Sequence, residues 1–317
     1  MDGNKFTLNG KVIIDLTNDN VLEEDVRNGK IFHKADGSVC VGTADMGGEE
    51  WIGDGKSHLW IEIGAEGGID VSLYFYQSVS NGVTIDWGDG SATETVSSNM
   101  YRYASHTYTK SGKYIITLDA AEGCSLEFGD GNSTGSVMGT SSFNRCTIKK
   151  LEIGGDVSSI GRYAFNGCGA LTDVKILDGV KYTSDGVFKS CDSLVRVELP
   201  NSLTSIGTSA FTSCYSLQNI KLPDSLTLID SNAFQICPFT HIEFPSSVKT
   251  IKSYAFDNCT NMKVYDFTKH TAVPTLGGTN TFNKIPADCE IRVPAALVDE
   301  WKAATNWSTY ASQIVGV

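Results

Sequence analysis

Cysteine is the residue type in this sequence with the widest chemistry, because thiols form disulfides, bind metals and act as nucleophiles. The chain has nine cysteines, and five recur every 22 or 23 residues, each three positions after a phenylalanine. One thiol per repeat does not supply the partners of a disulfide framework, and no C-x-x-C or closely spaced His pair offers zinc ligands. We therefore expect a row of buried thiols that pack as small apolar side chains, with disulfides as the alternative. The pairs are Phe165/Cys168, Phe188/Cys191, Phe211/Cys214, Phe234/Cys237 and Phe256/Cys259.

Two other motifs suggest chemistry that their context does not support. Asp86 and Asp89 could form a calcium pair, but their positions in an Asp-Gly turn favour hydrogen bonding within the turn. Residues 53–57 end like a phosphate-binding loop, yet Glu50 stands where the first glycine of that loop belongs. We predict no catalytic residue, no metal site and no cofactor.

The repeat predicts the fold of the C-terminal half. Each unit starts with a short L-x-x-[V/I]-x-[L/I] strand, which a Pro or Gly usually ends. A second apolar residue and an Ala-Phe pair follow, and one unit alone cannot bury them. Stacked units would share one core and a parallel sheet, forming a solenoid of about 23 residues per turn. Phe143 and Cys146 form a partial copy before the first unit, whereas residues 262–290 lose the pattern.

The repeat strands carry polar residues at two outward positions. At the fifth position Glu and Lys alternate, and since neighbouring strands lie about 4.8 Å apart, each charge would face opposite charges. We interpret this row as a structural ladder on an exposed sheet face, with a ligand site as the alternative. The row is Glu152, Lys175, Glu198, Lys221 and Glu243. The third position is less regular and is where we expect a partner to bind: Lys150, Asp173, Arg196, Asn219 and His241.

These units resemble the BspA-like leucine-rich repeats of bacterial and protist surface proteins. The resemblance rests on segments such as Leu203-Thr204-Ser205-Ile206-Gly207-Thr208-Ser209-Ala210-Phe211-Thr212-Ser213-Cys214 and covers residues 137–261. Residues 291–297 read as a last strand followed by Pro294 at a helix start, and with Trp301 and Trp307 they are similar to the C-terminal cap of that family. One departure is Gly186-Val187, which replaces the Ala before Phe188. The resemblance implies adhesion or recognition without catalysis, and it identifies no ligand.

A small Ig-like antiparallel β-sandwich is expected before the repeats. Alternating strands at 59–63, 71–76, 83–86 and 114–118 are separated by turn residues. Asp86-Trp87-Gly88-Asp89-Gly90-Ser91, His106-Thr107-Tyr108 and Gly112-Lys113-Tyr114 resemble a PKD domain over residues 57–121. That resemblance implies a spacer or binding module, and it gives His106 a structural role rather than that of a catalytic base.

The first 50 residues predict a separate short module. A strand at 11–16, a helix at 21–27 capped by Asn20, and a hairpin around Asp36-Gly37 are expected. The module is similar to N-terminal pieces of phage tail or fibre proteins, which implies attachment or oligomerisation. The predicted organisation is an N-terminal module at 1–50, a PKD-like β-sandwich at 51–122, and a leucine-rich-repeat solenoid with its cap at 123–317.

Charge and hydropathy exclude several functions. The net charge is −12, and the acidic excess lies in the N-terminal half, so no basic surface for nucleic acid is expected. No stretch approaches the roughly 18 apolar residues of a membrane span, so membrane insertion is not expected. The N-terminus lacks the basic start and apolar core of a signal peptide, which indicates another export route or a trimmed leader.

The sequence is best explained as a non-enzymatic, extracellular binding protein on a bacterial surface. Its partner would be a host or cell-surface protein or glycan, and oligomers could form through the N-terminal module. The alternative is a phage tail or fibre protein involved in host attachment, located in the virion. A third interpretation is an accessory module of a carbohydrate-processing system, which would require glycan binding.

Overall fold

The computed structural model describes residues 51–64, 69–97, 101–129 and 148–317, and four short strands nearer the N-terminus. The chain divides into two compact units, Met1–Ile52 and Gly53–Val317. In the first unit β1 (Lys5–Leu8) pairs antiparallel with β2 (Lys11–Asp15), and β3 (Ile31–His33) with β4 (Val39–Val41). Strands β2, β3 and β4 lie where the sequence predicts them. The predicted helix at 21–27 and the partial copy at Phe143 and Cys146 lie outside the described residues.

The second unit is built from two long sheets and one short sheet. The front sheet has the order β16-β14-β12-β5-β10-β7-β8, and the back sheet has the order β22-β20-β18-β17-β15-β13-β11-β6-β9. The front strands are β5 (Ser57–Ile63), β7 (Val83–Asp86), β8 (Glu94–Thr95), β10 (Gly112–Ala120), β12 (Ile148–Ile153), β14 (Asp173–Ile176) and β16 (Arg196–Glu198). The back strands are β6 (Ile69–Gln77), β9 (Tyr101–Tyr108), β11 (Leu126–Phe128), β13 (Val157–Ile160), β15 (Tyr182–Thr183), β17 (Ser205–Ile206), β18 (Leu228–Ile229), β20 (Thr250–Ile251) and β22 (Thr275–Leu276). The end sheet comprises β19 (His241–Glu243), β21 (Val264–Asp266), β23 (Glu290–Val293) and β24 (Ile314–Gly316).

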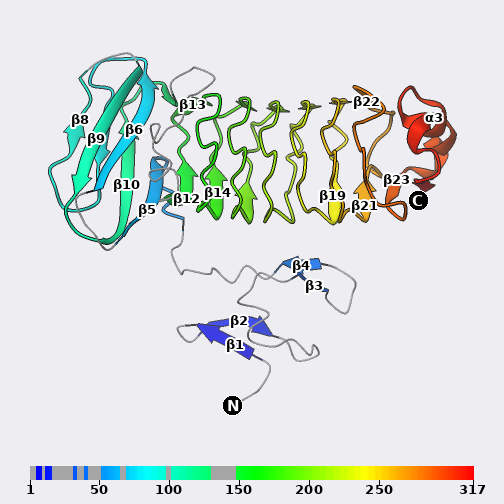
Figure 1. The fold of residues 1–317 in the computed structure, drawn as a ribbon, viewed down its shortest axis with the longest axis horizontal. Coiled ribbons are helices and arrows are strands. Elements are labelled where there is room, and N and C mark those ends of the chain that lie inside the picture. Colours follow the sequence, from blue (N-terminus) through cyan, green and yellow to red (C-terminus); the bar gives the residue numbers. More distant parts are fainter. Residues whose placement is uncertain are drawn as a thin grey trace. The chain divides into compact units, whose positions relative to one another are not determined.

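The C-terminal part of this unit is the predicted solenoid. Figure 1 shows β12, β14, β19, β21 and β23 along one side of the stack, with β13 and β22 along the other. Neighbouring turns pair in parallel along both sides, as β12 does with β14 and β17 with β18, except between β16 and β19 on the front side. The stacked turns bury a shared core, which confirms the fold that the repeat predicts.

The antiparallel strands before the solenoid continue its sheets rather than standing apart from them. Strand β5 pairs antiparallel with β12, and β6 pairs antiparallel with β11, which itself pairs with β13. The edges of the first solenoid turn are therefore hydrogen-bonded and not exposed. Residues 57–128 thus close the N-terminal end of the stack.

A column of phenylalanine rings fills the solenoid core. From Phe165 to Phe256 the rings stack with centroids 5.3 to 5.6 Å apart, and every ring is fully buried. The column extends beyond the repeats that the sequence shows, to Phe128 at one end and Phe282 at the other. Residues 262–290, where the sequence pattern is lost, still form a turn of the stack, because Phe282 stacks on Phe256 at 5.7 Å after 26 residues instead of 22 or 23.

The cysteines form the expected row of buried thiols, and they also donate hydrogen bonds. All seven described cysteines are free and buried. Each thiol from Cys191 to Cys259 donates to the carbonyl oxygen of the phenylalanine 25 or 26 residues earlier, at 3.1 to 3.3 Å. Burial raises the pKa of Cys214 and of Cys259 to about 12, and raises that of Cys191 and Cys237 well above the usual value.

Besides the strand pairing of the two sheets, backbone hydrogen bonds also join neighbouring units through their Ala-Phe segments. Residues two before and two after the phenylalanine have positive φ, as at Ser209 and Ser213 around Phe211. Because left- and right-handed conformations alternate, the N–H groups of all three residues point toward the next unit. In the units of Phe165, Phe188, Phe211 and Phe234 they donate to carbonyls of the next unit at 2.8 to 3.2 Å. The next unit therefore satisfies backbone groups that a single turn would leave unpaired.

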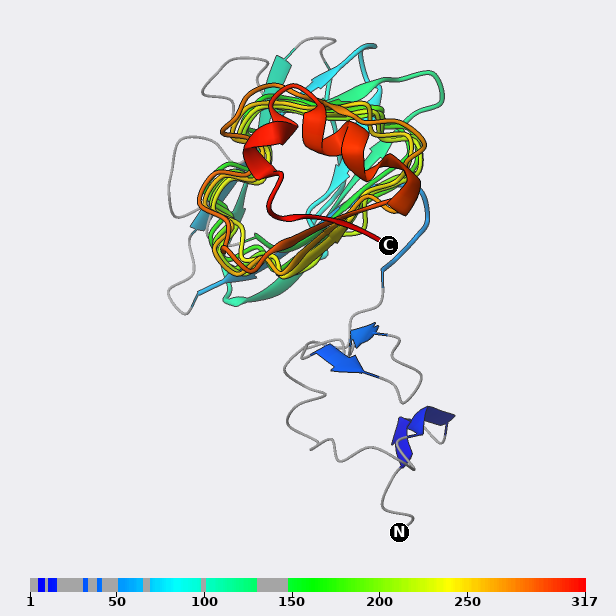
Figure 2. The same cartoon turned by 90° about the vertical axis from the view of Figure 1, so that its right-hand side faces the viewer.

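A helical cap covers the C-terminal end of the stack. It consists of η1 (Ala295–Leu297), α3 (Val298–Ala303) and η2 (Trp307–Tyr310), and Figure 2 shows these helices lying across the last turns. Trp301 and Trp307 are fully buried, and the Phe282 N–H donates to the Tyr310 hydroxyl at 3.0 Å. The sequence places the last strand at 291–293, within β23, but β24 follows the cap and pairs with β23.

Candidate binding face

The outward side of the front and end sheets, here called the binding face, carries both polar rows singled out from the sequence. Register places the third positions Lys150, Asp173 and Arg196 opposite one another, and the fifth positions Glu152, Lys175 and Glu198 likewise. The alternation of charge is therefore real over these three strands. The face also extends onto β5 and β10, which the sequence does not reveal.

The fifth-position row continues into the N-terminal strands. His58 on β5 pairs with Glu152, and Thr117 on β10 pairs with His58. Glu152 is fully buried rather than exposed, which corrects the prediction for this member of the ladder. Its carboxylate accepts the Gly53 N–H at 3.2 Å and lies 3.6 Å from the Lys175 ammonium.

The row changes character at its other end. Glu243 lies opposite Asp266 in register, so the strict alternation of sign stops there. Its carboxylate forms an ion pair with Lys269 instead. The row of charges is therefore buried and fully hydrogen-bonded or paired at Glu152, and it is exposed to solvent at Glu243.

Three of the five third-position residues already contact other side chains of the protein. The Lys150 ammonium lies over the Trp60 ring, 4.8 Å from its centroid, and Lys150 is only 8% exposed. This corrects the expectation that Lys150 lies on an exposed face. Asp173 and Arg196 form an ion pair at 2.9 Å. Lys150 is thus held by Trp60 of β5, whereas Asp173 and Arg196 neutralise each other across β14 and β16.

The other two, Asn219 and His241, form no hydrogen bond, ion pair or ring contact with any other described side chain. His241 is exposed and Asn219 is half-buried. Lys221, from the fifth-position row, is likewise exposed and unpaired within the described residues. An amide, an ammonium and an imidazole therefore remain free to contact a partner.

The free side chains lie where the strand ladder is interrupted. The front sheet ends at β16, the end sheet starts at β19, and residues 217–222 between them form no strand. The turns still stack there, with Phe211 and Phe234 centroids 5.4 Å apart. Across the described residues, no backbone group of 218–222 forms a hydrogen bond, so amide donors and acceptors are also available.

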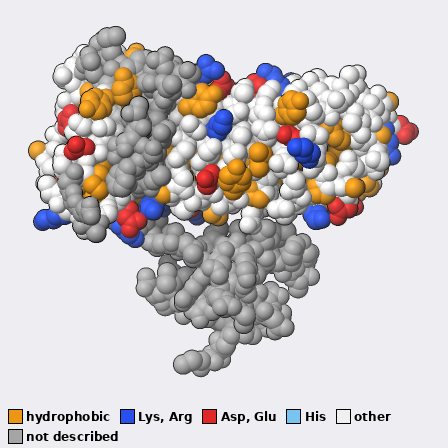
Figure 3. Space-filling view, viewed as in Figure 1, with side chains coloured by type: hydrophobic (Ala, Val, Ile, Leu, Met, Phe, Trp, Pro, Cys, Tyr) orange, Lys and Arg blue, Asp and Glu red, His pale blue; other side chains and the backbone are white. Residues whose placement is uncertain are grey.

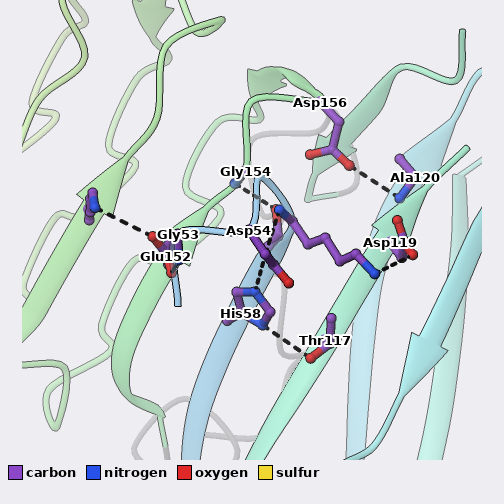
Figure 4. Close-up of polar contacts among 12 residues, drawn as sticks. Gly53, Asp54, His58, Thr117, Asp119, Ala120, Glu152, Gly154 and Asp156 are labelled. Carbon is purple, nitrogen blue, oxygen red and sulfur yellow. Dashed lines mark hydrogen bonds and ion pairs between the residues drawn. The ribbon is translucent and has the colours of Figure 1, made fainter. Parts of the chain in front are cut away.

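Figure 4 shows a second polar cluster, at the junction of the N-terminal strands and the first solenoid turn. The His58 ring has Nε2 at 2.8 Å from Asp54 Oδ1 and Nδ1 at 3.1 Å from Thr117 Oγ1. Carboxylate, imidazole and hydroxyl in this order are the parts of a nucleophilic triad. His58 is only 2% exposed and both ring nitrogens are occupied, so the cluster serves to hold residues 53–58 in place.

Other contacts in the cluster fix the same segment. The Gly154 N–H donates to Ser57 Oγ at 2.9 Å, and the Lys56 ammonium lies 2.6 Å from Asp119. Burial raises the pKa of Asp54, but the hydrogen bonds from His58 and the Lys56 N–H and the positive charges nearby together outweigh burial, so the pKa is lowered overall. The cluster therefore joins β5, β10 and β12 at their ends.

The turn residues at 86–91 form the turn hydrogen bonds expected from the sequence. Asp86 accepts the Gly88 N–H at 2.8 Å and Asp89 accepts the Ser91 N–H at 3.0 Å. His106 lies 2.7 Å from Asp89 and stacks on Trp87. No group of three or more His, Cys, Asp or Glu residues in the described parts of the chain is arranged to hold a metal ion.

The stacked turns, the two continuous sheets and the terminal cap define a leucine-rich-repeat solenoid. Residues 114–272 match the BspA type leucine-rich repeat region in six copies, which spans half of the chain, and the protein belongs to this family. The match begins within β10 and extends past residue 261. A comparison with curated proteins gave no match.

Several solved structures are similar to parts of the chain. A leucine-rich repeat protein of T. pallidum is 27% identical, with a TM-score of 0.40, over 44% of this chain and 65% of its own. One from Bacteroides ovatus is 29% identical, with a TM-score of 0.36, over 46% and 44%. A leucine-rich cell surface protein of Faecalibacterium prausnitzii is 28% identical, with a TM-score of 0.32, over 40% and 41%. This chain spans less than two thirds of each.

Proposed function

We propose that this protein is a non-catalytic, extracellular recognition scaffold that binds a protein or glycan partner at a bacterial cell surface. The observation that carries the proposal is the set of unpaired side chains Asn219, Lys221 and His241 on successive turns of the binding face. Neighbouring positions on the same face are occupied by architectural contacts, so these three are left for a partner. Membership in the BspA type repeat family supports a surface location.

The chemistry of these side chains indicates what would bind. Asn219 offers an amide donor and acceptor, Lys221 a cation, and His241 an imidazole. Together with the unpaired backbone of 218–222, they suit a partner rich in carbonyl, carboxylate or hydroxyl oxygens. Figure 3 shows acidic and basic side chains interspersed along the solenoid on the side in view, without an extended basic area. No helix in the described parts of the chain has the length and apolar character needed to cross a bilayer.

Binding of the purified chain to a printed panel of extracellular matrix proteins and of neutral and acidic glycans tests the proposal. The Asn219→Ala/Lys221→Ala/His241→Ala variant should lose binding to the ligand that the wild type retains, while its melting temperature stays unchanged. The matched control is Thr275→Ala, an exposed residue on the back sheet. Equal binding by the triple variant and the wild type would contradict this assignment of the site.

A further inference from the structure

The outer side of β6 and β9 pairs polar residues with each other at one end and tyrosines with each other at the other. In register, Asp70 lies opposite Thr107, Ser72 opposite Ser105, and Tyr74 opposite Tyr103. The alternate β6 residues Val71, Leu73 and Phe75 are fully buried, so Ser72, Tyr74 and Tyr76 lie on the side away from the core. This two-stranded ribbon is hydroxyl-rich at one end and aromatic at the other.

The aromatic end, here called the tyrosine platform, consists of Tyr74, Tyr76 and Tyr103. Tyr103 is 61% exposed, and no large apolar or aromatic side chain in the described residues is more exposed. Tyr74 and Tyr103 face each other across the strands, yet neither forms a ring contact or a hydroxyl hydrogen bond within the described structure. Two ring faces and two hydroxyl groups are therefore available side by side.

The described side chains around the platform on β6, β9 and β11 are polar or acidic. Ser72 and Ser105 present hydroxyl groups beside the rings, and Thr107 donates a hydrogen bond to Asp70 beyond them. Glu127 on β11 lies opposite Tyr76 on the other side. Among the described outward residues of these three strands the only charges are acidic, so a sulfated, phosphorylated or uronic-acid polymer would be repelled.

We infer that the tyrosine platform is a docking site for a neutral glycan chain, distinct from Asn219, Lys221 and His241 on the binding face. A pyranose ring has an apolar face of C–H groups, which packs on an aromatic ring, and a rim of hydroxyl groups. Tyrosine supplies a large contact area at low entropic cost, and Ser, Asp and Glu oxygens accept hydrogen bonds from the sugar rim. This combination matches a neutral sugar in both charge and hydrogen-bonding character.

A protein partner is the weaker match for this surface. Protein interfaces concentrate their energy in well-packed, desolvated pockets, with charged groups depleted at the core. Here the rings stand on a two-stranded surface with Ser, Thr, Asp and Glu as neighbours. The inference rests on the proposed role of the chain as a recognition scaffold, and it specifies a partner class and a second site for that role.

Affinity electrophoresis of the full chain in gels containing soluble neutral polysaccharides, such as β-glucans, mannans and galactomannans, tests the inference. We expect at least one polymer to retard the wild type, and the Tyr74→Ala/Tyr103→Ala variant to bind it at least about tenfold more weakly. The control is Tyr182→Ala, which removes an exposed tyrosine from β15 of the same sheet and should leave retardation unchanged. An unchanged melting temperature confirms that the double variant is folded.

The outcomes separate this inference from the proposed function. Retardation that is lost in the Asn219/Lys221/His241 triple variant but kept in the tyrosine variant would overturn the platform and support the binding face. Absence of retardation by every neutral polymer would overturn the platform, even if the wild type binds a matrix protein on the printed panel. Retardation by an acidic polysaccharide alone would also contradict it, because the platform has no cation to recognise one.

Discussion

The ring of Tyr163 occupies the space that a side chain on Gly186 would need. A Cβ atom added to Gly186 would overlap the Tyr163 ring, and Gly186 has a φ of +61°. The next units have Ser209 and Asn232 at the same position with similar φ values, so the backbone conformation alone does not demand glycine. Glycine therefore stands at position 186, where the following units have Ser209 and Asn232, because the Tyr163 ring one turn earlier fills the space of a side chain.

Gly186→Ser should destabilise the protein by about 1–3 kcal/mol, because it forces the Tyr163 ring out of its place. Tyr163→Ala should relieve most of that cost, so the two changes together should be far from additive. Urea unfolding of the two single variants and the double variant measures the coupling. Ser209→Ala, which keeps a Cβ atom where no ring interferes, serves as the control. An additive double variant would show that left-handed strain, and not the ring, requires glycine.

Phe211→Ala should lower the melting temperature clearly. The ring is fully buried between Phe188 and Phe234, and removal of a buried Phe costs about 3–5 kcal/mol. Thermal unfolding followed by circular dichroism checks this, with the exposed Tyr215→Ala as the control. An unchanged melting temperature for Phe211→Ala would refute the stacked column.

The seven described cysteines should resist alkylation in the folded protein at pH 8. They are buried, and burial raises the pKa of Cys214, Cys259 and Cys289 to about 12, so little reactive thiolate forms. Alkylation mapped by mass spectrometry should label these positions only after denaturation. Rapid labelling of the native chain at any of Cys168, Cys191, Cys214, Cys237 or Cys259 would argue against the closed core.

Acid should destabilise the C-terminal end through His270. The ring is 4% exposed and packs against Phe267 and Trp301, and burial lowers its pKa below the usual 6.5 despite its hydrogen bond with the Val248 carbonyl. The unfolded chain then binds a proton at a pH where the folded chain does not, so stability falls as pH drops below about 6.5. His270→Gln should reduce this pH dependence in urea unfolding at pH 5 to 8. The exposed His241→Gln should leave it unchanged, and a pH profile unaffected by His270→Gln would rule His270 out as its origin.

A fragment of residues 53–317 should remain monomeric, whereas a fragment starting at residue 123 should associate or lose stability. The shorter fragment lacks β5 and β6, which pair with β12 and β11, and so exposes two strand edges and the N-terminal end of the core. Light scattering and thermal melts of both fragments test this. A monomeric 123–317 fragment with the melting temperature of the longer one would show that the solenoid closes its own end.

The sequence predicts those parts of the fold that repeat. Phe165 to Phe256 and their cysteines recur at nearly constant spacing because every turn has the same core position to fill. Phe128 and Phe282 occupy that position too, but their spacings of 37 and 26 residues break the period, so the pattern does not reveal them. The thiol hydrogen bonds join each cysteine to the preceding turn, and spacing alone does not show them.

The sequence predicts which residues of the repeat strands point outward, but not what covers or neutralises them. Periodicity places Lys150 and Glu152 on the outward side of a strand, yet it cannot show that β5 and residues 53–54 cover them, because that contact spans nearly a hundred residues. It also cannot show that Asp173 and Arg196 neutralise each other while Asn219 and His241 remain unpaired. The tyrosine platform depends on the antiparallel register of β6 and β9, which a single sequence does not encode visibly.

The hydroxyl of Tyr310 has a consequence for how such a protein can change in length. The Phe256 N–H donates to the Thr281 carbonyl of the next turn, whereas the Phe282 N–H donates to Tyr310, a side chain of the cap. The last turn therefore offers no free donor at this point to which a further turn, or the end of a second copy, could attach. Duplication of turns has to insert them upstream of Phe282. Such insertions would leave both ends of the stack unaltered, and the array can lengthen only from within.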